Sequence, residues 1–310
     1  MVSTPTSVPS ADGLHRFVDE AEYHQDRGSL SVSGAKLLLP PSCPAKFREY
    51  MDTERKPKKE WDFGHVAHHV VLGKGAEFKV LDPAVHGLKA DGTPSDKPTA
   101  TGAWKKAADD ARKRGLTPIH VDDHAKAEQM AARVLTHPAA FELFRDGDAE
   151  VALYHTDPET GVRLRGRVDW LQPNGDLVDY KTSTTANPAE LVRKFWSLGY
   201  FMQAAWYRDL VIALGLAENP RFRFVAQEKE PPFVVTVVEY DDDAIAEGQR
   251  LNREAIRLYV QCTERDEWPG YSDDTVTISL PGWATYQAER NNHAADDLMA
   301  ALEAALTEQD

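Results

Sequence analysis

Residues 166–181 constrain the fold more than any other stretch, because two strand-like segments there flank an Asn-Gly pair. Asn-Gly readily supplies the positive φ angles of a tight turn, so the stretch predicts a β-hairpin. Side chains alternate between the two faces of a strand, and Asp179 and Lys181 therefore share one face. Pairing across the hairpin places Asp169 opposite Asp179. Two carboxylates and a lysine are thus predicted to converge.

This cluster of charges points to a bound cation. Adjacent carboxylates repel each other, so one takes up a proton or the pair binds a cation. Carboxylate oxygens suit Mg²⁺, which proteins commonly bind through one or two carboxylates together with a substrate phosphate. A lysine beside the ion can orient an attacking water or offset charge on the phosphate. The alternative is an ordinary surface hairpin, because an Asp-x-Lys tripeptide alone is common.

Composition narrows the classes of protein that the 310-residue chain can belong to. Its net charge of -14 argues against a protein that coats nucleic acid nonspecifically, because Lys and Arg make the phosphate contacts. Its two cysteines exclude a four-cysteine iron–sulfur cluster within one chain. No apolar run approaches the roughly 20 residues of a membrane span, and no signal-peptide pattern opens the chain, so we expect a cytoplasmic protein.

A helix is predicted over residues 62–72, with Asp62 as its N-cap. His65, His68 and His69 stand at i, i+3 and i+4 and fall on adjacent parts of one helix face. Histidines four residues apart can hold zinc, so a zinc protein built on His65 and His69 is one interpretation. The Glu of the His-Glu-x-x-His motif is missing, which weighs against it.

Further strands are predicted on either side of the hairpin. Residues 150–155 predict a strand before it, so that three antiparallel strands result. Glu150 begins this strand and is a candidate additional carboxylate. Two more strands at 221–227 and 233–239 extend the sheet, and a helix is predicted over 242–262.

A long helix is predicted from Asn187 to about Leu214, because Asn, Pro and Glu occupy the positions that favour a helix start. Tyr200, Gln203 and Tyr207 lie at i, i+3 and i+7 on one face of it. This face is either the polar edge of a core or part of a site.

Other stretches carry weaker signals. Residues 1–28 lack periodicity, so regular structure is expected to begin only at Leu30, and Ser33 is predicted to cap a short helix that ends near Leu39. Residues 73–103 are predicted to be irregular, with prolines and glycines throughout. Residues 285–306 predict an amphipathic, acidic helix that is suited to an oligomer contact.

The motifs around the hairpin resemble the core of the PD-(D/E)XK nuclease superfamily. Asp169 corresponds to its first carboxylate, and Asp179 and Lys181 correspond to the second half of the motif. Val168 stands where the superfamily name has Pro, a position that makes no bond to metal. The Gly and His pair at 64 and 68 is typical of the RecB-like and RecE-like branch.

Two later segments extend the resemblance to the RecE (exonuclease VIII) type of phage and prophage exonuclease. Gln203 and Tyr207 resemble the Q-x-x-x-Y motif of that branch, which helps to hold the DNA end and the region of the active-site lysine. Residues 268–271 and 278–284 resemble its closing segment. The resemblance implies a flexible segment at 1–21, an exonuclease domain at 22–284 and a C-terminal helix at 285–310.

The resemblance implies an α/β fold with a central mixed β-sheet flanked by helices, the restriction-endonuclease-like fold. It implies an exodeoxyribonuclease that depends on Mg²⁺, with Mn²⁺ as a possible substitute. Such an enzyme digests linear double-stranded DNA from 5′ to 3′. The 3′ overhangs that it leaves serve phage-type recombination. The resemblance further implies a homo-oligomer, a single-strand annealing protein as partner, no membrane, and the host cytoplasm if the protein is phage-encoded.

The resemblance also assigns roles to residues. The metal ligands are His68, Asp169, Asp179 and the Tyr180 carbonyl, with His65 or His69 as alternatives to His68. Lys181 positions the attacking water, and Gln203 and Tyr207 position the substrate. The arginines of the first hairpin strand either contact phosphates or pack across strands; they are Arg163, Arg165 and Arg167.

Two other functions fit the same motifs. A RecB-like or restriction-type endonuclease shares all of them, and it differs in cutting closed circular DNA. A noncatalytic DNA-binding protein keeps the fold without the chemistry, and the intact set of Asp169, Asp179 and Lys181 argues against it.

Overall fold

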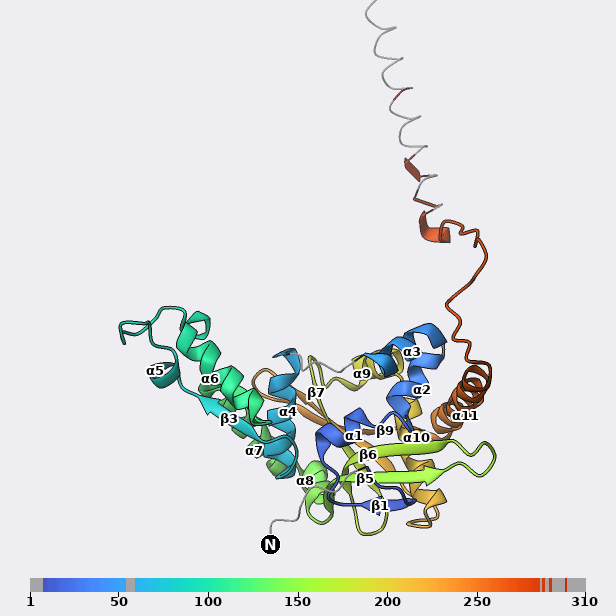
Figure 1. Cartoon of the computed structure of the whole chain (residues 1–310), viewed down its shortest axis with the longest axis horizontal. Helices are drawn as coiled ribbons and strands as arrows, with labels where there is room; N and C mark the ends of the chain where they lie inside the picture. Colours follow the sequence, from blue (N-terminus) through green and yellow to red (C-terminus); the bar gives the residue numbers. More distant parts are fainter. Residues whose placement is uncertain (1–7, 54–58, 285, 288–289, 292–298, 300–310) are drawn as a thin grey trace, which may run out of the picture. The chain divides into compact units, whose positions relative to one another are not determined.

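The computed structural model describes residues 8–53 and 59–284 and five positions beyond them, 286, 287, 290, 291 and 299 (Figure 1). The chain divides into two compact units, Met1–Trp268 and Pro269–Asp310. The helix expected at 285–310 lies mostly outside the described residues, and the domain limits expected at 22 and 284 stay predictions. No described helix combines the length and apolar character that crossing a membrane requires.

The first unit is built on a seven-stranded mixed sheet in the order β1-β5-β6-β7-β8-β9, with β2 paired to β6. β2 is parallel to β6 and β7 is parallel to β8, whereas the other pairs are antiparallel. The strands are β1 (Gly13–His15), β2 (Leu30–Ser31), β5 (Asp148–Thr156), β6 (Arg163–Leu171), β7 (Leu177–Ser183), β8 (Phe222–Glu228) and β9 (Val235–Glu239). The predicted α/β fold with a central mixed sheet is confirmed.

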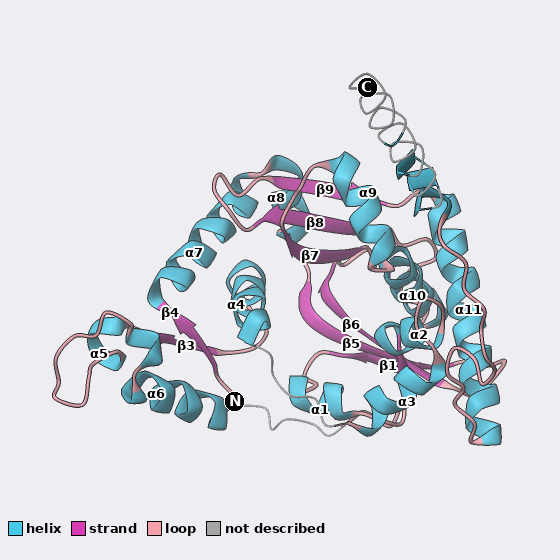
Figure 2. Cartoon of the chain, turned by 90° about the horizontal axis from the view of Figure 1, so that it is seen from above, coloured by secondary structure: helices cyan, strands magenta, loops and turns pink. Residues whose placement is uncertain are grey.

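Helices cover both faces of the sheet (Figure 2). One core joins the sheet to α2 (Val32–Leu38), α3 (Pro44–Asp52), α9 (Pro188–Ser197), α10 (Tyr200–Ala213) and α11 (Asp242–Arg265). A second core joins it to α4 (Lys59–Leu72), α7 (Val121–Thr136) and α8 (Pro138–Phe144). Successive side chains of β7 point to opposite faces of the sheet, so the strand contributes to both cores. Leu177 lies in the first core, and Val178 and Tyr180 lie in the second.

A separate group of elements, which we call the arm (residues 78–120), is inserted between α4 and α7 (Figure 1). It consists of β3 (Phe78–Leu81), α5 (Pro83–His86), the 3-10 helix η1 (Pro98–Ala100), α6 (Gly102–Lys113) and β4 (Thr117–His120). β3 and β4 form their own parallel two-stranded sheet. The prediction of an irregular stretch at 73–103 is wrong where β3, α5 and η1 fall within it, whereas residues 87–97 contain no helix or strand, as predicted.

The hairpin predicted at 166–181 is present, and its two strands pair only beside the turn. The β6–β7 register contains Trp170 opposite Val178 and Leu171 opposite Leu177, and then the strands diverge. β7 continues by pairing with β8 along its whole length. Asp169 and Asp179 are the first residues beyond the last pair, so they lie where the sheet opens.

Local signals explain where the helices of this unit begin and end. Asn187 caps α9 by accepting a hydrogen bond from the Ala189 N–H at 3.1 Å, as predicted. The long helix predicted to about Leu214 is instead two helices, because Gly199 adopts a left-handed conformation with φ of 62°. α10 then starts in a new direction.

Three other predictions about helix starts and the N-terminal region are wrong. Ser31, not Ser33, caps α2, because its side chain accepts a hydrogen bond from Gly34 N–H. Asp62 lies inside α4, which begins at Lys59. The stretch without periodicity at 1–28 contains β1 and the helix α1 (Glu20–Gln25), because strand pairing with β5 and capping by Asp19 stabilise them.

The packing of α10 against α11 yields a first prediction. A Cβ added to Gly248 on α11 would lie 2.5 Å from the Phe201 carbonyl oxygen of α10. The backbone cannot move aside without separating the helices, so we expect Gly248→Ala to lower the free energy of unfolding by about 1–3 kcal/mol in urea denaturation. Gly102→Ala is the control, because nothing lies within 4 Å of the added Cβ. Equal unfolding midpoints for the two variants would contradict this account.

Candidate active site

The site lies where β6 and β7 separate. Asp169 Oδ2 accepts a hydrogen bond of 2.9 Å from the Tyr180 backbone N–H, which has lost its strand partner on that side. α4 packs beside β7 and brings His68 Nδ1 to 3.6 Å from the same carboxylate oxygen. The His68 ring also meets the Tyr180 ring edge-on, with centroids 5.2 Å apart. One residue of α4 and two of the hairpin therefore form a single cluster.

Glu150 completes this cluster from β5. Its neighbours Ala149 and Val151 pair with β6 on either side of Asp169, so Glu150 stands opposite Asp169. Its φ of 54° is left-handed, a conformation that costs a non-glycine residue about 1–2 kcal/mol. Arg167 Nε donates to Glu150 Oε2 at 2.6 Å and helps to hold this conformation.

The ligand atoms of the cluster are close enough to share one ion. Donor atoms of His68, Glu150 and Asp169 all lie within 4.8 Å of one another. The Asp169 side chain keeps 15% of its exposure and that of His68 keeps 25%, so the cluster is open to an ion from solvent. The expected role of the Tyr180 carbonyl as a further ligand stays a prediction.

Asp179 is not among these three residues and is held by protein groups, so its expected role as a metal ligand stays a prediction. Its Oδ2 lies 2.6 Å from Lys181 Nζ, and Gln203 Nε2 donates to Oδ1 at 2.5 Å. Asp179 is only 2% exposed, so these two partners replace the water it has lost. The Lys181 ammonium lies 5.0 Å from the centroid of the Tyr200 ring. Asp179 and Gln203 thereby fix the position of Lys181.

Tyr207 reaches the site through close packing. A Cβ added to Gly166 would lie 2.8 Å from Tyr207 Cε1, so the glycine lets the ring lie directly on β6. Tyr207 is 8% exposed and, with Asp169, lines the neighbouring cavity. Burial raises the pKa of its phenol well above its ordinary value, so the hydroxyl is neutral.

Burial and mutual repulsion shift the ionisation of the site. Burial, followed by the charge of Asp179, raises the pKa of Asp169 to about 8. Burial and Asp169 also raise the pKa of Glu150, while burial and Lys181 lower that of His68. For Lys181, burial lowers the pKa, but Asp179 and Asp169 outweigh it and the net shift is upward. Lys181 therefore stays protonated, whereas Asp169 and Glu150 resist ionisation.

This donor set fits a divalent cation. His68 is neutral, as a ligand must be, and the two carboxylates repel each other unless a proton or a cation joins them. Carboxylate oxygens with one imidazole nitrogen are ligands that divalent metals accept in proteins. The three residues therefore provide a site whose electrostatic cost a bound divalent ion relieves.

The three histidines of α4 have different environments. His69 Nδ1 lies 3.3 Å from the Gly75 carbonyl, and its ring contacts Phe78 of the arm. His68 alone of the three joins the carboxylates in the donor cluster. Across the part of the chain that the structure describes, no second group of three or more ligand side chains is close enough to hold a metal ion, so a zinc site on His65 and His69 lacks a third ligand there.

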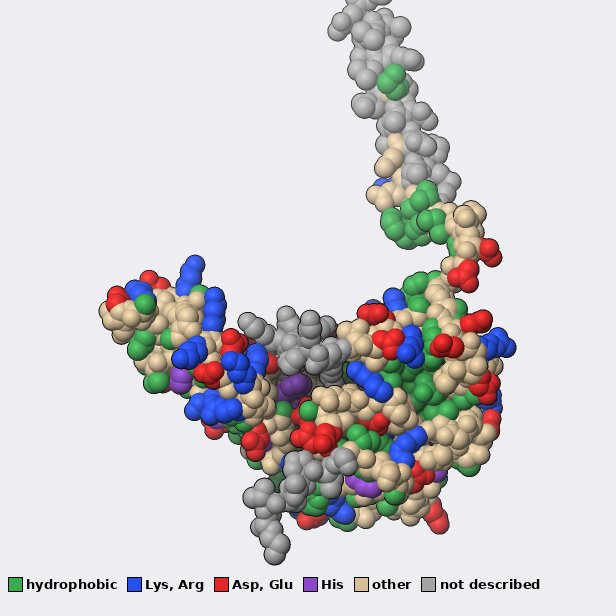
Figure 3. Space-filling view, viewed as in Figure 1, with side chains coloured by type: hydrophobic (Ala, Val, Ile, Leu, Met, Phe, Trp, Pro, Cys, Tyr) green, Lys and Arg blue, Asp and Glu red, His purple; other side chains and the backbone are tan. Residues whose placement is uncertain are grey.

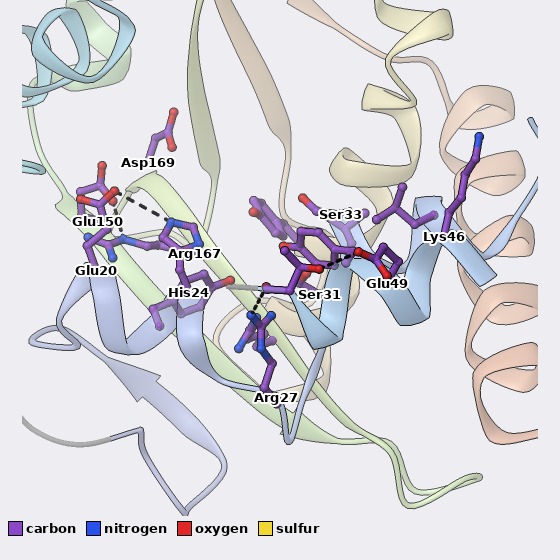
Figure 4. A pocket seen from close by; sticks show the side chains of 17 residues that line it. Glu20, His24, Arg27, Ser31, Ser33, Lys46, Glu49, Glu150, Arg167 and Asp169 are labelled. Carbon is purple, nitrogen blue, oxygen red and sulfur yellow. Dashed lines mark hydrogen bonds and ion pairs between the residues drawn. The ribbon is translucent and has the colours of Figure 1, made fainter. Parts of the chain in front are cut away.

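A cavity of about 850 Å³ extends from the donor cluster toward α2 and α3 (Figure 4). Asp169 and Glu150 lie at one end, and Lys46 and Glu49 of α3 lie at the other. Its polar lining between these ends includes His24, Arg27, Ser31 and Ser33. The cavity offers hydroxyl and cationic groups within reach of the cluster.

Lys36 of α2 is a neighbour of the site that the sequence reasoning missed. Its Nζ donates to the Leu198 carbonyl at 3.0 Å and lies 5.6 Å from the Tyr200 centroid, the ring that Lys181 also contacts. Burial and Lys181 lower the pKa of Lys36 to about 8. The sequence signal that could have identified Lys36 is that it is the single charged residue within the otherwise apolar run from Gly34 to Pro41.

Protein groups hold the three arginines of β6. Arg165 is 3% exposed and pairs with Asp26 at 2.9 Å. Arg167 pairs with Glu150, and Arg163 donates to backbone carbonyls at residues 9–11. These contacts favour packing over phosphate binding, the two interpretations that the sequence left open.

The fold and the site define a PD-(D/E)XK-like protein. Residues 31–280 match the family described as "PDDEXK-like domain of unknown function (DUF3799)", so the chain belongs to that family. It is also similar to a crystal structure from Eubacterium rectale named "putative exonuclease", with a TM-score of 0.56 and 13% identity, covering 86% of this chain and 97% of that one. At this identity the similarity shows the fold alone. No curated protein matched the sequence.

The raised pKa of Asp169 predicts pH-dependent metal binding. A group whose pKa is raised on folding stabilises the protein at low pH, and this stability is lost as the pH rises from about 4 to about 8. A divalent ion must displace the proton below about pH 8, so its affinity should rise by up to about tenfold per pH unit. We expect Mn²⁺ to raise the melting temperature more at about pH 8.5 than at about pH 6.5.

Two variants control this measurement. Asp169→Asn should remove most of the Mn²⁺-induced shift at both pH values, because it removes the titrating ligand. Asp91→Asn, on an exposed turn of the arm, should leave the shift unchanged. A wild-type shift that is absent, or that is equal in the Asp169 variant, would count against the cluster as a metal site.

Proposed function

We propose that this protein is a metal-dependent exodeoxyribonuclease that hydrolyses linear double-stranded DNA. One observation carries the proposal: His68, Glu150 and Asp169 converge beside a fixed Lys181. The match to a PDDEXK-like family and the fold shared with the Eubacterium rectale structure support a nuclease. The cation we propose is Mg²⁺, with Mn²⁺ as a substitute.

Each side chain of the site has its own role in phosphodiester hydrolysis. His68, Glu150 and Asp169 would hold the ion, which when bound polarises phosphate and lowers the pKa of water. Lys181 orients the attacking water and offsets the negative charge that develops on the phosphate. Asp179 keeps the lysine in place, and Gln203 in turn holds Asp179, because Lys181 and Gln203 contact different oxygens of the same carboxylate. Tyr207 forms part of the wall against which the substrate lies.

The RecE-like branch is the proposed relationship within the superfamily. Its support is the Gln203 to Asp179 hydrogen bond, which gives the Q-x-x-x-Y segment a role in positioning the lysine. Digestion from 5′ to 3′, phage-type recombination, a homo-oligomer and an annealing partner belong to the same proposal. The cavity beside the cluster supports a strand end as substrate, because Arg27 and Ser31 line it and can contact a phosphate.

Substitution of Lys181 tests the chemistry. Lys181→Ala should reduce digestion of end-labelled linear duplex in Mg²⁺ by about 100-fold or more, because it removes the charge that stabilises the transition state. It also leaves Asp179 without its cation, so melting curves must show that the variant is folded. Lys229→Ala, a lysine outside the site, is the matched control. Equal digestion by all three proteins would defeat the role of Lys181.

A comparison of linear and closed circular duplexes tests the mode of cleavage. An exonuclease needs an end, so we expect release of labelled nucleotides from the linear form and an intact closed circle over the same time. Asp169→Asn run in parallel excludes a contaminating nuclease. Cutting of the closed circle by the wild type, absent in the variant, would instead establish the endonuclease alternative.

A further inference from the structure

The arm differs in charge from the rest of the molecule. Residues 78–120 contain eight Lys and Arg and five Asp and Glu, a net charge of +3 in a chain whose net charge is -14. The remaining residues therefore sum to -17. Figure 3 shows Lys and Arg side chains gathered over the arm. A local positive surface on an acidic protein attracts a polyanion.

Most of the arm's lysines have no ion-pair partner. Five of them are exposed, and the ion pairs found among the described residues include none of the five. They are Lys79, Lys89, Lys97, Lys105 and Lys106. The arm's other cations include Arg112, paired with Asp62 at 2.7 Å, and Lys113, 3.9 Å from Asp110.

Lys105 and Lys106 are adjacent and lie in the N-terminal half of α6, which has no acidic residue in its first turn. Asp109 and Asp110 follow four residues later on the same helix, yet neither forms an ion pair with these two lysines in the part of the chain that the structure describes. The two ammonium groups are therefore available to an anionic partner.

The arm is anchored to the helix that carries His68. Arg112 near the end of α6 pairs with Asp62 of α4, and α4 also packs against β4 and α7. Lys105 is seven residues from Arg112 along α6, or roughly 10 Å, and His68 is six residues from Asp62 along α4, or roughly 9 Å. The lysines thus lie within roughly 20–30 Å of the donor cluster.

We propose that the arm binds the phosphate backbone of duplex DNA ahead of the cleavage site. This inference rests on the proposed nuclease function and adds the surface that holds the undigested substrate. At 3.4 Å per base pair, the reach from the cluster to Lys105 and Lys106 corresponds to about six to nine base pairs. Flexible, exposed lysines suit phosphates, which fix position on the duplex without reading sequence.

The aromatic side chains of the arm favour a duplex over a single strand. Binding of single strands relies on aromatic side chains that stack on bases. Trp104, next to the lysine pair, already packs against His120 in a tilted ring contact with centroids 5.4 Å apart. Phe78 contacts His69 and His124. The arm therefore offers charge for a backbone and keeps these rings packed within the protein.

The test compares two double variants that lose the same charge. Lys105→Gln/Lys106→Gln alters the arm, and Arg133→Gln/Arg265→Gln alters two exposed cations outside it. Binding of a duplex of about 30 base pairs is measured in Ca²⁺, over a range of salt concentrations. The arm variant should bind about tenfold or more weakly at about 0.1 M salt, and the slope of log affinity against log salt should fall by about 1.8. The control variant should match the wild type.

Two further substrates test whether the arm variant loses only the binding of long duplexes: short duplexes and a small phosphodiester. The loss in the arm variant should disappear on DNA hairpins whose stems are shorter than about six base pairs, which a loop keeps paired. Hydrolysis of bis(p-nitrophenyl) phosphate should be unchanged, because that substrate cannot reach the arm. Equal affinities and salt slopes for wild type and arm variant, or an equal loss on single-stranded DNA or on an RNA duplex, would overturn the proposal.

The outcomes separate this inference from the function on which it rests. A wild type that binds duplex through the arm and cleaves no phosphodiester would refute the nuclease and leave the arm as a DNA-binding surface. A wild type that cleaves DNA with no dependence on Lys105 and Lys106 would refute the arm and leave the nuclease.

Discussion

The hydrogen bond from the Tyr180 N–H to Asp169 joins the fold of this protein to its site. Where β6 and β7 separate, backbone groups lose their ladder partners, and a buried N–H without a partner is costly. The Asp169 carboxylate takes the place of the missing strand. The opening of the sheet and the acidic cluster are therefore one structural feature, since the residue that stabilises the divergence is also a ligand candidate.

The carboxylates around this opening are compensated in two different ways. Asp179 is neutralised within the protein by Lys181 and hydrogen-bonded by Gln203, so its charge is satisfied as the structure stands. Asp169 accepts a hydrogen bond from the Tyr180 N–H and Glu150 pairs with Arg167, yet burial and a neighbouring carboxylate raise the pKa of each. A cation bound by Asp169 and Glu150 would relieve this repulsion, whereas Lys181 already offsets the charge of Asp179.

Sequence patterns predicted those parts of the site that depend on local rules. The turn and the alternation of side chains along a strand placed Asp169 across from Asp179 and Lys181 beside Asp179, but they did not reveal that the two strands separate at that point. The break at Gly199 was missed, because a glycine in a helical pattern does not reveal whether the chain turns there. The left-handed Glu150 and the choice of His68 depend on contacts between distant segments, which single-sequence periodicity does not contain.

The helix α4 connects the chemistry of the site to the arm. His68 on α4 faces the carboxylates, the next residue His69 contacts Phe78 of the arm, and Asp62 pairs with Arg112 of α6. Packed protein interiors transmit displacement because they contain little free volume. One helix therefore holds the His68 imidazole beside the carboxylates and anchors the arm through two contacts.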